Sequence, residues 1–204
     1  MSSFSQGVEK PNYIIHPYKF NLWLFMLSLM MVFGGLTSAY LVAKGRIANP
    51  IVFDLPTILW NNTLVIAFSS ITVQFSVWAM KRGERNRALL GMLLTLVLGI
   101  VFLAGQFYAW DLLEMRNLGF AEQIDSEGNI HQDSSVSFFY VFTGLHGCHI
   151  VGGVVVVLYT LIRSWLNKFK ESGEVLTYEL VATFWHFLGL LWIYLFIFLL
   201  YTQN

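Results

Sequence analysis

The sequence has few charged residues and only one cysteine among its 204 residues. Asp, Glu, Lys and Arg together make up 12%, about half of the share that is typical of soluble domains. The formal net charge is zero, so the composition gives no indication of a nucleic-acid partner. The lone Cys148 excludes an internal disulfide framework and a cysteine-rich zinc or copper site built from this chain alone.

Apolar residues dominate instead. Hydrophobic residues make up 56% of the chain and aromatic residues 17%, which is typical of an integral membrane protein. A helix crosses a bilayer of about 30 Å with roughly 20 apolar residues. Charge-poor segments of that length lie at about 21–43, 59–80, 88–113, 135–163 and 178–202. Because backbone in lipid must satisfy its own hydrogen bonds, these segments are predicted to be helices.

The predicted fold class is therefore an all-α integral membrane protein, a five-transmembrane-helix bundle that forms a single membrane domain over residues 1–204. The first segment is too long for the core of a signal peptide, so we expect it to be retained. Nine basic residues lie on one side of these spans: Lys10, Lys19, Lys81, Arg82, Arg85, Arg87, Arg163, Lys168 and Lys170. The other side has Lys44, Arg46 and Arg116. Basic residues favour the cytoplasmic side, which predicts the N-terminus inside and the C-terminus outside.

Small and polar residues recur along single faces of the last four spans. In lipid, such stripes allow helices to approach closely. The stripes are Ser69, Thr72 and Ser76; Gly91, Thr95 and Gly99, followed by Gln106; Gly144, Cys148 and Gly152; and Glu179, Ala182, Thr183, His186 and Gly189. We therefore expect Cys148 to have a packing role.

Residues 142–153 read FTGLHGCHIVGG and place His146 and His149 in an apolar span. The two are neighbours on one helical face, because they are three residues apart. His186 lies in the next span, and His149 and His186 are expected at similar depths. A haem between these two imidazoles, a metal site and purely structural pairing of polar groups all remain open. A proton relay is disfavoured, since the apolar cores of the first three spans lack Asp, Glu and His.

Four stretches resemble subunit III of the haem–copper terminal oxidases. FFYVFTGLHGCHIVGG at 138–153 resembles the signature of that family, and YELVATFWHFLGLLWIYLFIFLLY at 178–201 resembles its last helix. The segment 62–110 is similar to its Ser-Ser-x-Thr helix, basic turn and Leu-Gly-x-x-Phe helix. NLWLFMLSLMMVFGGLTSAYLV at 21–42 fits the opening helix of the short, five-helix bacterial form.

The resemblance implies a subunit without haem or copper of its own, since these lie in partner subunits. Such a subunit packs on the catalytic subunit I, which reduces oxygen to water and pumps protons, and it binds phospholipid in a bacterial inner membrane. The implied structural polar cluster comprises His146, His149, Glu179 and His186. The implied lipid-binding residues are Arg163, His149, Glu179, Trp185 and His186. Partners are then the oxidase subunits and phospholipids, with no nucleic acid, and membership of a respiratory supercomplex stays open.

The chain departs from the family at three positions where a membrane acid is customary: Leu29, Ala109 and Gly189. Roles that depend on those carboxylates are not expected here, so we predict mainly a packing and lipid-organising subunit. The family's electron-donor sites lie on other subunits, so the sequence does not separate the two donors; we favour a cytochrome c oxidase, with a quinol oxidase as the alternative. A membrane b-type cytochrome with His149 and His186 as axial ligands ranks next. A transporter or channel ranks last, because broken helices and paired intramembrane charges are missing from the sequence pattern.

Overall fold

The computed structural model describes residues 16–45, 55–120, 123–124, 130–131, 134–166 and 171–203. Its helices are α1 (Pro17–Lys44), α2 (Ile58–Lys81), α3 (Arg85–Glu114), α4 (Ser134–Trp165) and α5 (Glu171–Gln203). Two short antiparallel strands, β1 (Gln123–Ile124) and β2 (Ile130–His131), lie between α3 and α4. All five helices are long and apolar enough to cross a membrane, which confirms the prediction of five spanning helices in a helical fold.

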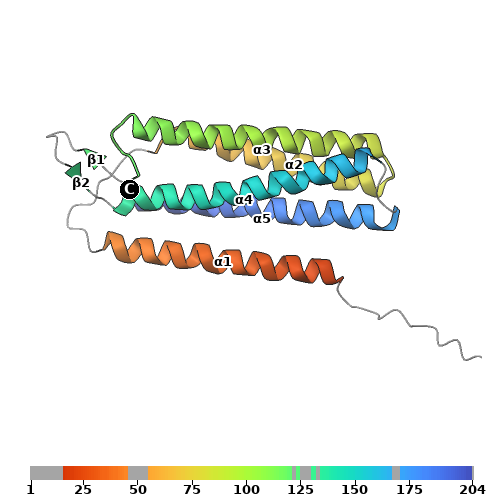
Figure 1. Cartoon of the computed structure of the whole chain (residues 1–204), viewed down its shortest axis with the longest axis horizontal. Coiled ribbons are helices and arrows are strands. Elements are labelled where there is room, and N and C mark those ends of the chain that lie inside the picture. The colour runs from red at the N-terminus through yellow and green to blue at the C-terminus, as the bar shows by residue number, and fades with distance from the viewer. Residues whose placement is uncertain are drawn as a thin grey trace, which may run out of the picture.

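The helices run side by side along the long axis of the molecule (Figure 1). α2, α3, α4 and α5 form a four-helix body, and α1 packs on its outside against α4 and α5. The start of α1 and the end of α5 lie at opposite ends of the bundle (Figure 1). At the end where α5 finishes, the Lys44 ammonium donates a hydrogen bond to the Thr202 carbonyl, which fixes the last turn of α1.

The α2–α3 hairpin is the most closely packed pair of helices. Gly83, with φ of 75°, makes the turn that joins them. A Cβ on Gly91 would lie 2.9 Å from the Cβ of Ser76, so only glycine allows this approach. The hydroxyls of Thr72 and Thr95 lie 2.8 Å apart across the same interface. The small-residue stripes predicted on these two helices therefore do pack against each other.

The stripe predicted on α4 packs inside the chain only at Gly144, where a Cβ would lie 3.8 Å from the ring of Trp110, and this is a correction. Cys148 and Gly152 are exposed. Gly153 faces the core instead, where a Cβ would lie 3.1 Å from the ring of Trp185 and 3.2 Å from Leu188. Spacing alone identifies a face of small residues, but successive residues point about 100° apart around the helix, so it does not say which face turns inward.

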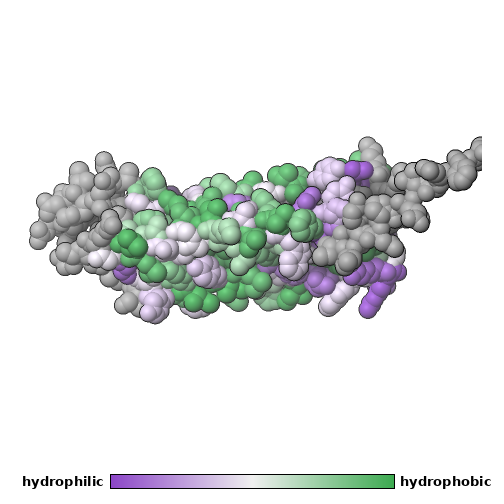
Figure 2. Space-filling view, turned by 90° about the horizontal axis from the view of Figure 1, so that it is seen from below, coloured by the Kyte–Doolittle hydropathy of each residue, from purple (hydrophilic) through white to green (hydrophobic). Residues whose placement is uncertain are grey.

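The middle of the bundle presents large apolar side chains to its surroundings, and hydrophilic residues gather toward the end at which α1 begins (Figure 2). Such a surface is suited to lipid or to the apolar surfaces of partner subunits. Six basic residues lie at or next to the helix ends there: Lys19, Lys81, Arg82, Arg85, Arg87 and Arg163. We call this end of the bundle the basic end.

Candidate functional site

Glu179 lies between two lysines at the basic end. Its Oε2 is 2.7 Å from Lys19 Nζ and its Oε1 is 2.8 Å from Lys81 Nζ. The three side chains come from α5, α1 and α2, so the cluster bridges helices α1 and α2, which do not pack against each other directly. All three remain partly exposed, with 25% of the glutamate and 42% and 50% of the lysines accessible. The cluster therefore carries a net positive charge that is accessible from outside the chain.

His186 lies two helical turns beyond Glu179 on α5. Its Nε2 is 3.1 Å from Oε1 of Gln74 on α2. Since an amide oxygen only accepts hydrogen bonds, this geometry makes the imidazole the donor. The side chains of Glu179, His186 and Gln74 line one cleft of about 300 Å³, together with Lys19, Leu22, Trp23, Val77, Lys81, Leu180, Ala182 and Thr183.

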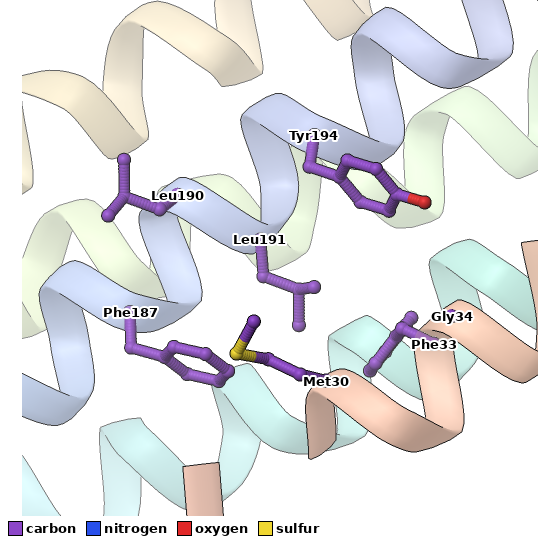
Figure 3. A pocket seen from close by; sticks show the side chains of 7 residues that line it. All are labelled: Met30, Phe33, Gly34, Phe187, Leu190, Leu191 and Tyr194. Carbon is purple, nitrogen blue, oxygen red and sulfur yellow. The ribbon is translucent and has the colours of Figure 1, made fainter. Parts of the chain in front are cut away.

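Further clefts lie along α5, on its sides toward α2 and α1. His186 also lines two clefts against α2, of about 380 and 290 Å³, and Leu190 lines both the larger of these and a cleft of about 460 Å³ against α1. Figure 3 shows the last of these, which is lined by Phe187, Leu190, Leu191 and Tyr194 of α5 and by Met30, Phe33 and Gly34 of α1. We call these clefts together the α5 groove. It is charged at the basic end and almost wholly apolar beyond His186.

His149 does not line the α5 groove. Its Nδ1 is 2.7 Å from the Leu145 carbonyl of its own helix, and its ring meets Phe33 of α1 edge-on at 6.0 Å. His149 and His186 thus have different partners on different helices, and no contact pairs them as facing axial ligands. Among the described residues, no group of three or more His, Cys, Asp or Glu lies close enough to hold a metal ion.

His146 is fully buried in the four-helix body, although it is only three residues from His149. Its ring lies 5.9 Å from Phe102 of α3 and 5.2 Å from Trp192 of α5, measured between centroids. Neither ring nitrogen has a protein hydrogen-bond partner among the described residues. The four residues of the predicted polar cluster therefore do not form one cluster. Glu179 and His186 both line the α5 groove, whereas His146 and His149 each lie in a different environment.

The two remaining residues predicted to bind lipid lie outside the groove. Trp185 is fully buried and donates its indole N–H to Ser69 Oγ at 2.8 Å, so its ring does not reach the surface of the chain. Arg163 lies in the last turn of α4, where its Nη1 is 2.7 Å from the Tyr159 hydroxyl. Of the five predicted residues, Glu179 and His186 are those that line the groove.

Sequence reasoning missed Glu174, which is nearly buried near the start of α5. Its Oε1 accepts a hydrogen bond from Ser164 Oγ at 2.7 Å and lies 3.4 Å from Arg85 Nη2. Tyr178 donates to the same serine at 3.0 Å. The network joins the adjoining ends of α3, α4 and α5. Its signal in the sequence is weak, because Glu174 sits in a polar stretch beside another acid, Glu171.

Comparisons with known proteins give a consistent result. Residues 5–203 match the family model described as "Cytochrome c oxidase subunit III". The chain is 32% identical over 180 residues to the "Probable cytochrome c oxidase subunit 3" of Nocardia farcinica, covering 86% of this chain and 82% of that protein. It is 30% identical over 185 residues to the "Cytochrome c oxidase subunit 3" of Thermostichus vulcanus, with 86% and 82% covered. It is 28% identical over 188 residues to the "Probable quinol oxidase subunit 3" of Staphylococcus haemolyticus, with 87% and 85% covered.

Proposed function

Because the chain belongs to the cytochrome c oxidase subunit III family, we propose that it is the non-catalytic subunit III of a bacterial respiratory cytochrome c oxidase. The observation that carries this proposal is the family match over residues 5–203 in a chain with five helices able to cross a membrane. In this role the chain packs on the catalytic subunit and organises lipid beside it. Haem and copper, with the reduction of oxygen and the pumping of protons, belong to the partner subunits.

The proposal includes one membrane domain in the bacterial inner membrane, with its N-terminus in the cytoplasm. The distribution of basic residues supports this orientation. Lys19, Lys81, Arg82, Arg85 and Arg87 are at the basic end, whereas the opposite side of the spans has Lys44, Arg46 and Arg116. An excess of basic residues favours the cytoplasmic face. A cysteine-accessibility experiment on intact cells, with single cysteines at Arg87 and at Arg116, would test the assignment.

The electron donor is proposed to be cytochrome c, with quinol as the alternative. The relatives from Nocardia farcinica and Thermostichus vulcanus support the first, and the relative from Staphylococcus haemolyticus supports the second. The deciding experiment is purification in mild detergent through a tag on this chain. We expect haem and copper to co-purify, with oxygen consumption driven by reduced cytochrome c. Oxygen consumption driven only by quinol would show that quinol is the electron donor. Isolation of the chain without haem, copper or any oxygen-reducing partner would overturn the proposal.

The α5 groove is the proposed phospholipid site of this subunit. Lys19 and Lys81 at its mouth would attract a phosphate, while the apolar walls beyond His186 would accommodate an acyl chain. Glu179 and His186 keep their proposed lipid contacts. Arg163 and His149 lie outside the groove, and we retain them as proposed contacts for lipid on other faces of the chain.

Replacing both lysines with glutamine tests this site. We expect the Lys19→Gln, Lys81→Gln complex to assemble and to retain less anionic phospholipid, measured by mass spectrometry of the purified oxidase. Arg87→Gln is the matched control, since Arg87 is a basic residue of the same end whose guanidinium pairs with Glu84 outside the groove. An unchanged lipid content in the double variant would rule out the groove as the site.

A further inference from the structure

Two polar side chains inside the four-helix body have no protein partner among the described residues. They are His146 of α4, which is 0% exposed, and Gln106 of α3, which is 1% exposed. Both ring nitrogens of the histidine, and both the oxygen and the nitrogen of the amide, are unpaired. Buried polar groups in folded proteins are almost always hydrogen-bonded to protein or to ordered water. Two such side chains in one bundle therefore require an explanation.

The two side chains lie at the same level of the bundle. α3 and α4 pack antiparallel, and Trp110 of α3 donates its indole N–H to Thr143 of α4 at 3.0 Å. One turn back along α3 from Trp110 is Gln106, and one turn on along α4 from Thr143 is Gly147. Because the helices are antiparallel, these two positions are opposite each other. His146 directly precedes Gly147, and both His146 and Gln106 are buried, so we infer that the imidazole and the amide lie near each other inside the four-helix body.

There is also open space at this level. Gly147 is buried, yet a Cβ built on it would meet no atom within 4 Å other than those of its two chain neighbours and of the backbone of its own helix. The buried Gly91 and Gly99 of α3 behave oppositely, since an added Cβ would collide with Ser76 at the first and with Trp185 at the second. The interior beside Gly147 therefore has room for a small molecule.

The chemistry of the surrounding groups selects water. A neutral imidazole offers one donor and one acceptor, and a glutamine amide offers two donors and one acceptor oxygen. Phe102 and Trp192 confine the ring of His146, which limits its rotation toward a protein partner. We propose that the four-helix body contains an enclosed hydration site beside Gly147, at which bound water bridges the amide of Gln106 and the imidazole of His146. The water satisfies both side chains and ties α3 to α4.

A methyl group placed in the site tests the proposal in the assembled oxidase. Gly147→Ala would displace the water and leave Gln106 and His146 unpaired. The matched control is Gly152→Ala, because Gly152 is on the same helix, also meets nothing within 4 Å, and is exposed. Both variants gain the same helix propensity. We expect the thermal midpoint of the Gly147→Ala complex to lie at least about 2 °C below that of the control. A midpoint equal to or above the control would show a dry void and overturn the proposal.

A second measurement is independent of whether that variant assembles. A high-resolution cryo-electron microscopy map of the unaltered complex should show a density peak within hydrogen-bond distance of both Gln106 and His146. A map in which the amide bonds the imidazole directly, or in which the space is empty, would overturn the proposal. The double variant Gln106→Leu, His146→Phe should lose the peak and recover part of the stability lost in either single variant, because it leaves no orphaned polar group.

Discussion

Trp185 of α5 donates its indole N–H to the hydroxyl of Ser69 on α2 over 2.8 Å, with both side chains fully buried. The same hydroxyl donates to the Ile66 carbonyl at 2.8 Å, so it both donates and accepts. The ring of Trp185 also fills the space left by the absent side chains of Gly99 and Gly153. One tryptophan thus contacts α2, α3 and α4, which makes it the centre of the four-helix body.

The first prediction concerns that hydrogen bond. Ser69→Ala leaves a buried indole N–H without an acceptor, and we expect it to destabilise the subunit by about 1–3 kcal/mol. Ser70→Ala is a close control, because Ser70 donates to the same Ile66 carbonyl but accepts nothing from Trp185. Thermal unfolding of the purified oxidase, followed through loss of this subunit, gives the comparison. Equal midpoints for the two variants would show that the Trp185 bond contributes nothing.

The second prediction concerns the closest helix approach. Gly91→Ala would bring a Cβ to 2.9 Å from Ser76 Cβ and 3.0 Å from the Thr72 carbonyl oxygen, both on α2. Because the Thr72 carbonyl is part of the α2 backbone and cannot yield, the hairpin must separate, at an expected cost of about 1–3 kcal/mol. Gly35→Ala on α1 is the control, since a Cβ there meets nothing within 4 Å. The midpoint of thermal unfolding should fall for the first variant alone, and an unchanged midpoint would contradict the packing seen at Gly91.

The sequence was sufficient to predict the helices and part of their packing. Long charge-poor runs predict spanning helices, because a helix satisfies all of its backbone hydrogen bonds within the segment when it lies in lipid. The stripe of Gly91, Thr95 and Gly99 was correctly assigned to packing. Gly91 and Thr95 meet the stripe on α2, which directly precedes α3 in the chain and forms a hairpin with it, and Gly99 meets Trp185 of α5. Cys148 was assigned wrongly, because α4 has small residues on two faces and only the three-dimensional arrangement shows that Gly153 faces the core.

The site was less predictable for the same physical reason. His146 and His149 belong to one sequence motif and lie three residues apart, but their side chains meet different helices. His146 packs against Trp192 of α5, and His149 packs against Phe33 of α1. Which neighbour each meets depends on helix rotation and on contacts between segments far apart in the chain. Glu174 was missed because its partners, Ser164 and Arg85, belong to two other helices. Composition gives no information on such contacts.

The third prediction addresses this network at the end of α5. Glu174→Gln removes the charge that faces Arg85 and weakens the acceptor of the Ser164 hydroxyl, so we expect a loss of about 1–3 kcal/mol. Glu84→Gln is the control, since Glu84 pairs with Arg87 in an exposed position, where an ion pair contributes little. Urea-induced or thermal loss of the subunit from the complex should be easier for Glu174→Gln. Identical curves would assign the network no stabilising role.

The last prediction separates lipid organisation from proton pumping. Glu179→Gln removes the carboxylate that pairs with Lys19 and Lys81, and so raises the net positive charge at the mouth of the α5 groove by one. The cluster is partly exposed, so assembly should persist. We expect an unchanged ratio of pumped protons to electrons in reconstituted vesicles, because the sequence pattern, with Leu29, Ala109 and Gly189 in the spans, predicts no carboxylate relay through them. We also expect more anionic phospholipid in the purified complex than in the Glu84→Gln control. A loss of pumping with assembly intact would contradict a purely packing and lipid-organising role, and a fall in anionic phospholipid would show that Glu179 itself helps to hold the headgroup.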